Sequence, residues 1–327
     1  MKRETLLSLA LICGCILTTH AQQKFYLKAS GGYFFSVFPG QFPKVGSYEP
    51  HDERKEYNAQ TGATTTISEK ILTGSYGAGG RGGLSFGWNI NHFIAVEGAF
   101  NYYRSKENLM TREITTLAGS NQVVGKIEAN GYVKAVDFAP SVVFNPNFEK
   151  VNPYVRFGMV IPLWGRLNIA TEASRSGTTV VGGQTLLSQT EISREESVHP
   201  NVTIGFQGAL GVLYPVTKRL DIFLETEYRN VPVRSKKKEV TAYDESITLR
   251  NPATGAAVAT QTRGLNDLSE AERYTEYQTT LNQQSNTPVS QEGATVKYKD
   301  DNKPSNDLKS YINIGGLGAN AGLRWRL

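Results

Sequence analysis

The sequence predicts an all-β fold. The chain contains 32 Gly, 16 Tyr and 14 Phe among its 327 residues, a bias that favours strands and turns over a helix bundle. In addition, apolar and polar residues alternate in steps of two over eight segments, which is strand periodicity. Short and long connections alternate between these segments, as in outer-membrane barrels. Together these observations predict an eight-stranded antiparallel up-and-down transmembrane β-barrel with four long extracellular loops.

Charge and hydropathy exclude two other classes of protein. The formal charge of +5, from 35 Lys+Arg against 30 Asp+Glu, is too small and too dispersed for a nucleic-acid surface. Beyond residue 21, no apolar run approaches the roughly 18 residues of a membrane-spanning helix. A helical membrane protein is therefore excluded, and no nucleic-acid partner is expected.

Residues 1–21 have the pattern of a secretory signal peptide. Lys2 and Arg3 precede a short apolar stretch, and small residues ending at Ala21 lead into a polar run, so cleavage is expected after Ala21. About twelve apolar residues are too few for an anchoring helix across ~30 Å of hydrocarbon. Lipidation at Cys15 is the alternative. Both cysteines lie in this segment, so the mature chain, 22–327, is expected to form no disulfide and no thiolate metal site.

The predicted strands place apolar or aromatic residues at every second position. In chain order they cover residues 25–37, 76–88, 94–103, 136–144, 155–163, 202–214, 220–228 and 317–327. The first carries Lys28 on its polar face. The second is rich in Gly, with Arg81 between apolar neighbours, and a tight turn joins it to the third, which carries Glu97. These two strands are predicted to form a hairpin.

The remaining strands repeat the alternation. Asp137 and Arg156 lie on the polar faces of the fourth and fifth strands, Gln207 on that of the sixth, and Glu225 on that of the seventh. The last strand ends the chain with Arg324 on its polar face. The expected long loops cover about residues 39–74, 105–130, 171–199 and 235–309.

The apolar phase is predicted to face lipid and the polar phase the lumen. In the opposite arrangement Arg81, Arg156 and Arg324 would meet lipid, at roughly 2–4 kcal/mol each near the midplane. A closed sheet is required because every backbone group in hydrocarbon must be bonded within the protein. A soluble β-sandwich is the alternative, and it would need the apolar phase inside.

The inward charges are expected to form a paired network that fills the lumen. An eight-stranded barrel is just wide enough for side chains to fill, and unpaired charges there would be costly. The predicted network consists of Lys28, Arg81, Glu97, Asp137, Arg156, Glu225, Glu227 and Arg324. A narrow passive channel of the porin kind, for small solutes, is the alternative.

The last eight residues carry a resemblance to a known family. Asn320 is followed by Gly322 and then by Trp325 and Leu327, which ends the chain. This pattern resembles the insertion signal of bacterial outer-membrane β-barrel proteins. With eight strands, the chain is similar to the transmembrane domain of the outer membrane protein A family and other small barrels. The family usually ends in an aromatic residue, so Leu327 is a departure. The resemblance implies recognition by the barrel-assembly machinery through the C-terminal strand.

The long loops are predicted to be folded. Residues 178–193, 240–249 and 256–262 are expected to form strands that project above the membrane. Both faces of residues 240–247 carry an acid, so neither face suits lipid. Residues 265–283 have apolar residues at helical spacing, with Asp267 or Ser269 as N-cap. They are expected to form a short amphipathic helix.

Catalytic candidates are few. Ser197 and His199, with Glu195 or Glu196 nearby, resemble the Ser and His of outer-membrane lipid deacylases. The sequence His51-Asp52-Glu53 is an alternative acid–base group of the kind found in outer-membrane proteases, or a solvated surface. No phosphate-binding loop, dinucleotide fingerprint or His-rich metal spacing is present.

The sequence thus predicts an exported protein of the bacterial outer membrane with a structural or surface-interaction role through its loops. No enzymatic activity and no cofactor are expected. The expected partners are outer-membrane lipid, the assembly machinery and a partner at the extracellular loops that the sequence does not identify.

Overall fold

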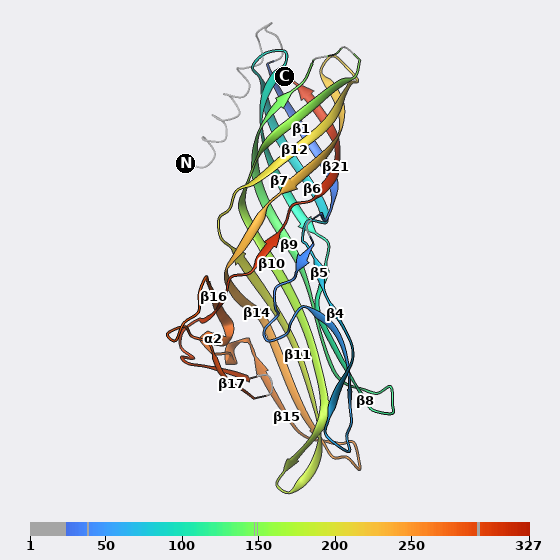
Figure 1. Cartoon of the computed structure of the whole chain (residues 1–327), viewed down its shortest axis with the longest axis vertical. Helices are drawn as coiled ribbons and strands as arrows, with labels where there is room; N and C mark the ends of the chain where they lie inside the picture. Colours follow the sequence, from blue (N-terminus) through green and yellow to red (C-terminus); the bar gives the residue numbers. More distant parts are fainter. Residues whose placement is uncertain (1–23, 38, 147, 149, 293–294) are drawn as a thin grey trace, which may run out of the picture.

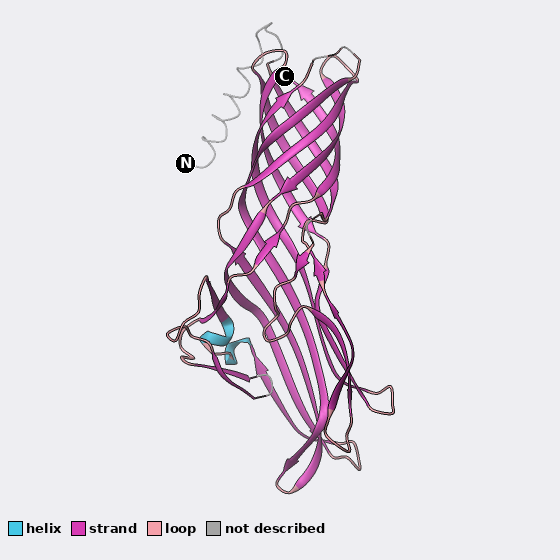
Figure 2. Cartoon of the chain, in the orientation of Figure 1, coloured by secondary structure: helices cyan, strands magenta, loops and turns pink. Residues whose placement is uncertain are grey.

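The chain forms an elongated, strand-rich body. The computed structural model describes residues 24–37, 39–146, 148, 150–292 and 295–327, so the predicted signal peptide and Cys15 lie outside the described residues. Figure 2 shows that almost all regular structure is strand, and 17 strands belong to one sheet. The C-terminus lies at one end of the long axis (Figure 1). Among the described residues, no helix is long and apolar enough to cross a lipid bilayer.

Eight strands of the large sheet pair in a closed circle at the end that carries the C-terminus. We call this part the closed ring; it comprises β1 (Phe25–Phe35), β6 (Gly79–Asn89), β7 (Ile94–Ser105), β9 (Val123–Phe144), β10 (Asn152–Val181), β12 (Gly205–Pro215), β13 (Leu220–Asn230) and β21 (Leu317–Arg326). Each pairs antiparallel with the next. β1 closes the circle because it pairs with β6 on one edge and β21 on the other.

Nine further strands continue the sheet beyond the ring. They are β3 (His51–Tyr57), β4 (Thr64–Ile71), β8 (Asn108–Leu117), β11 (Gln184–Pro200), β14 (Pro232–Arg250), β15 (Ala257–Gly264), β16 (Tyr274–Gln278), β19 (Ser305–Leu308) and β20 (Tyr311–Asn313). β9 and β10 belong to both parts, since their outer halves pair with β8 and β11. We call the nine strands, with these outer halves, the projecting sheet (Figure 1).

The predicted eight-stranded antiparallel barrel with four loops is therefore wrong as a description of the fold. The sheet has 17 strands and is mixed, since β3 pairs with β8, and β16 with β19, in parallel. β10 alone is 30 residues long. The prediction counted only segments with one apolar face as barrel strands and assigned the strands expected at 178–193, 240–249 and 256–262 to the loops, whereas nearly all of these residues belong to β10, β11, β14 and β15 of the same sheet. Hydrogen bonding between backbones does not depend on that pattern, so pairing continues past the point where the apolar face ends.

Short local motifs end and join the strands. At the turn between β6 and β7, Asn91 Oδ1 accepts hydrogen bonds from the N–H groups of Phe93 and Ile94, at 2.8 and 2.9 Å. Gly182 and Gly183 join β10 to β11 with φ of 57° and 79°, the backbone that a two-residue hairpin turn requires and that Gly adopts without strain.

The predicted helix at 265–283 is mostly wrong. The structure has a 3-10 turn, η1 (Leu265–Asp267), and one helical turn, α2 (Glu270–Arg273), before β16 begins. Ser269 is the N-cap of α2, and its hydroxyl accepts a hydrogen bond from the backbone N–H of Glu272. Tyr274 and Tyr277, which have helical spacing in the sequence, belong to β16, because its pairing with β14 and β19 outweighs the weak helical pattern. Two small sheets complete the fold: β2 (Gly40–Gln41) with β5 (Thr73–Gly74), and β17 (Pro288–Glu292) with β18 (Thr295–Tyr298).

Candidate functional site

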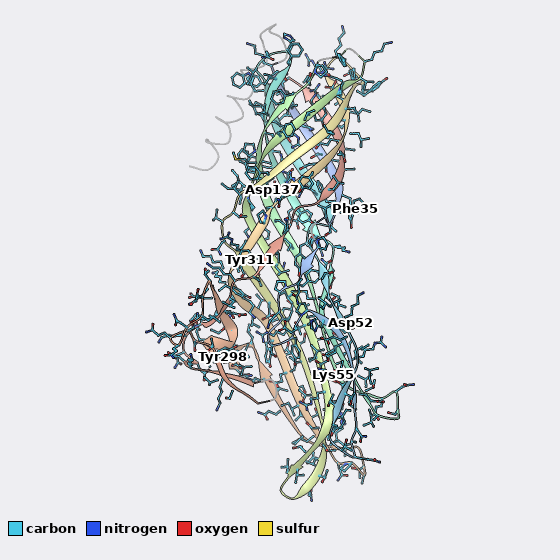
Figure 3. All side chains as sticks on the ribbon, in the orientation of Figure 1. Phe35, Asp52, Lys55, Asp137, Tyr298 and Tyr311 are labelled. Carbon is cyan, nitrogen blue, oxygen red and sulfur yellow. The ribbon has the colours of Figure 1, made fainter. Side chains whose placement is uncertain are left out.

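The interior of the closed ring is polar and its exterior apolar. Arg156 is 4% exposed and Glu225 3%, whereas Leu84 is 69% exposed and Phe35 64%. Asp137 and Phe35, both labelled in Figure 3, are 5% and 64% exposed. Alternation along each strand produces this difference, since successive side chains point to opposite faces. The predicted charge network belongs to the polar interior of the ring.

Glu225 is the centre of the first half of the charge network. Its carboxylate accepts hydrogen bonds from Lys28 Nζ at 3.2 Å, Arg156 Nη2 at 2.6 Å and Tyr154 Oη at 2.6 Å. Glu97 lies beside the same two cations, 3.9 Å from Lys28 Nζ and 4.0 Å from Arg156 Nη1. These residues come from β1, β7, β10 and β13, so the network joins strands from around the ring.

Glu227 is the centre of the second half. It accepts from Arg156 Nη2 at 3.3 Å and from Arg229 Nε, and its other cation is Arg81, whose Nη1 lies 3.8 Å away. Arg229 continues to Asp137, with Nη1–carboxylate distances of 3.0 and 3.1 Å. The connected group thus contains four cations, including the unpredicted Arg229, and four carboxylates, so its formal charge is zero.

Arg324 is the one predicted network residue that the structure does not bring to this group. It pairs with Asp221 at 2.7 Å, and Arg326 binds the second oxygen of the same carboxylate, also at 2.7 Å. This smaller cluster joins β13 to β21 near the end of the ring where the short turns lie. The other seven predicted residues form one network with Arg229.

Sequence reasoning missed Arg229 and Asp221, both 1% exposed. Asp221 lies on β13 at the same two-residue period as Glu225 and Glu227, a signal that could have included it in the network. Arg229 lies two positions after Glu227 on β13, on the same face, but the predicted strand ended at residue 228. Extending the period-two pattern to Asn230, the observed end of β13, would have included it.

Apolar layers lie at both ends of the charge network. Between the network and the short turns, Tyr26, Ala95, Val143, Tyr154, Leu213 and Phe223 form a buried cluster. At the end toward the projecting sheet a larger cluster includes Phe42, Tyr76, Tyr103, Met110, Val160 and Val231. The cavity within the charge network has a volume of only about 10 Å³, close to the minimum for one water molecule. The space within the charge network therefore holds about one water molecule at most.

The residues of the C-terminal pattern lie on β21 and directly after it. Asn320 points into the ring and donates hydrogen bonds to Glu225 at 3.2 Å and to Glu227 at 2.6 Å. A side chain at Gly322 would collide with the backbone of Ala29 on β1. Trp325 and Leu327 are 54% and 46% exposed. The polar and Gly positions thus serve the packing of the ring, and the apolar positions face outward.

Ser197 and His199 lie on one strand, β11, without the contacts of a catalytic pair. Within the described residues, Ser197 Oγ has no hydrogen-bond partner, and the side chain is 3% exposed. Burial, Arg166 and Lys237 together lower the pKa of His199, against a smaller opposite effect of Glu239. Glu196 is engaged elsewhere, 2.8 Å from both Arg194 and Lys238. A nucleophile requires a base within hydrogen-bond reach, and this arrangement does not provide one.

His51, Asp52 and Glu53 are also directed to separate partners. His51 Nδ1 lies 2.5 Å from Glu69, and Asp52 binds Arg112 through both carboxylate oxygens across the parallel β3–β8 pair. Glu53 pairs with Lys55 at 2.9 Å. The hydrogen bond from Arg112 is the main reason that the pKa of Asp52 is lowered, with burial opposing it. These contacts join β3 to its neighbours and form no acid–base group.

In the part of the chain that the structure describes, no three His, Cys, Asp or Glu side chains are placed to hold a metal ion. No protein-family model matches the sequence, and a search of curated proteins found no similar chain. Function must therefore be argued from the arrangement of the ring and the projecting sheet.

Proposed function

We propose that the closed ring spans the outer membrane of a bacterium, with a lumen filled by side chains, and that the projecting sheet presents an interaction surface outside the cell. The observation that carries this proposal is the reversal of the usual burial pattern. Soluble monomers rarely expose contiguous apolar patches larger than a few hundred Å². Here large apolar side chains are exposed on all eight ring strands, including Leu27, Leu84, Phe100, Val142, Phe157, Leu210, Leu224 and Leu323.

The same reversal argues against a soluble β-sandwich. A sandwich would bury the apolar phase between two sheets, whereas here the buried phase contains the charge network. In a bilayer both phases are satisfied, because lipid covers the apolar side chains and the ion pairs are completed within the ring.

The filled lumen favours a structural or interaction role over a passive channel. Ion pairs occupy the middle of the ring, apolar clusters lie on both sides of them, and the cavity within the ion-pair network is about 10 Å³. Reconstitution into planar bilayers tests this choice. We expect no stable single-channel openings at moderate voltage, and regular openings in the wild-type protein would favour the channel instead.

Thiol accessibility tests the membrane location itself. Single cysteines replace Leu84 and Leu224 on the ring exterior, and a third replaces Lys70 on the projecting sheet as a matched exposed control, in a mature chain that carries no cysteine. In lipid vesicles, a water-soluble maleimide should modify the control position and leave both ring positions unmodified. Equal modification at all three positions would refute the proposed membrane location.

A further inference from the structure

A row of cations follows the outer face of the sheet where the closed ring meets the projecting sheet. Arg104 on β7 lies opposite Lys134 on β9, and Lys134 lies opposite Arg166 on β10. Beyond Arg166, His199 on β11 lies near enough that Arg166 contributes to lowering its pKa, and it lies opposite Lys237 on β14. Three permanent cations on adjacent strands thus occupy one level of the sheet.

Three of these residues lack an acidic partner in the part of the chain that the structure describes: Arg104, Lys134 and Arg166 form no ion pair with a carboxylate. They lie over aromatic rings instead: Arg104 and Lys134 are 5.1 and 5.3 Å from the ring centre of Tyr132, and Arg166 is 5.7 Å from that of Trp164. Arg104 and Arg166 are exposed and Lys134 is half-buried, so the positive charge of the three side chains is available at the surface.

The row is immediately next to the apolar exterior of the ring. One level toward the ring, Tyr102, Val136 and Trp164 face each other across the same three strands. Tyr102 is 48% exposed and Trp164 43%. Aromatic side chains are enriched at the boundary between hydrocarbon and water, and a cation just beyond them lies at the level of lipid headgroups.

We infer that Arg104, Lys134 and Arg166 bind the phosphate groups of anionic lipids in the outer leaflet. This inference rests on the proposed function and names a partner for one level of the ring. Three uncompensated positive charges in register match the negative charge of such headgroups. Each Lys or Arg near an anionic membrane surface contributes about fivefold in affinity, so the row should select anionic over zwitterionic lipid by at least about tenfold once salt screening is included.

Fluorescence quenching of Trp164 measures this selection directly. With Trp88→Phe and Trp325→Phe, Trp164 is the remaining tryptophan. The protein is placed in vesicles of phosphatidylcholine, and brominated phosphatidylglycerol or brominated phosphatidylcholine is introduced as quencher. We expect the anionic lipid to quench Trp164 with a relative binding constant about tenfold higher than the zwitterionic one.

Two variants separate the row from general charge. R104Q/K134Q/R166Q should reduce the ratio of the two binding constants to within about twofold of one. K70Q/K126Q/R250Q, which removes the same charge from the projecting sheet, should leave the ratio unchanged. R104K/R166K keeps the charge and should keep the ratio. Heat-modifiable migration on a cold detergent gel checks that each variant is folded.

The outcomes distinguish the inference from the proposed function. Equal quenching by both lipids in the wild-type protein, or an unchanged ratio in the triple Gln variant, would overturn the inference. Reversal of the quenching by millimolar inorganic phosphate would assign the row to free phosphate and overturn the lipid assignment. If neither brominated lipid quenches Trp164, the membrane location of the ring is itself wrong.

Discussion

Replacing Glu227 by Gln tests whether the charge network stabilises the ring as a unit. Glu227 is 1% exposed and accepts from Arg156, Arg229 and Asn320, with Arg81 beside it. Four cations and four carboxylates balance in the native network, so the variant leaves one buried positive charge uncompensated. Removal of one partner of a buried ion pair typically costs about 3–5 kcal/mol. We therefore expect the free energy of unfolding to fall by about that amount.

Urea titration of the protein folded in lipid vesicles, followed by heat-modifiable migration, measures this loss. With a urea dependence of about 1–3 kcal/mol/M, the midpoint should fall by roughly 2 M. E227Q/R81M restores the charge balance and should recover part of the loss, because Arg81 has no other anionic partner within 4.0 Å among the described residues. E191Q, at an exposed position of β11, is the control and should change the midpoint little. A loss below about 1 kcal/mol in E227Q would refute the reasoning.

Three further predictions concern other parts of the molecule. Burial alone would raise the pKa of Glu196, but Arg194 and Lys238 outweigh it and lower the pKa to about 2. Because the folded-state pKa lies below the unfolded one, this stabilisation is present above about pH 4.5 and is lost as pH falls toward 2. Protease resistance of the projecting sheet should fall over that range, and less steeply in E196Q. G211V should disrupt folding, since a Cβ at Gly211 would collide with the Tyr154 ring. G208V should disturb folding less, because a Cβ there meets only Phe157, at 3.6 Å. Equal folded yields of the two variants on a cold detergent gel would contradict this difference. D52N and R112M should show a coupling energy of only about 0.5–1 kcal/mol in a double-mutant cycle of unfolding, because the Asp52–Arg112 pair is partly exposed. A coupling energy above about 2 kcal/mol would contradict this and show that the parallel β3–β8 pairing depends on this ion pair.

The sequence predicted the strand segments whose two faces differ. Lys28, Arg81 and Arg156 stand out between apolar neighbours, so their common location in the ring interior follows from the period of two. The sequence could not predict which carboxylate each cation contacts, because these contacts depend on the stagger between strands. Arg156, for example, reaches Glu225 and Glu227 on β13, which is not its neighbour in the ring.

The projecting sheet shows where the pattern carries less information. Residues 51–57 are nearly all polar, and nothing local indicates that they pair in parallel with β8. Parallel pairing of segments about 60 residues apart is a long-range property set by the surrounding sheet. Residues 274–278 are a second example. The spacing of their tyrosines predicted a helix, but long-range pairing with β14 and β19 makes them a strand.

The length of β10 has a mechanical consequence. Its 30 residues run from the short-turn end of the ring to the hairpin tip, a contour of about 100 Å at roughly 3.3 Å per residue. A partner that binds the tip and pulls along the strand would load the inter-strand hydrogen bonds in shear, because these bonds lie perpendicular to the strand. Many hydrogen bonds would then share the force at once. A force applied at the outermost turn is therefore transmitted to the closed ring before any single inter-strand hydrogen bond breaks.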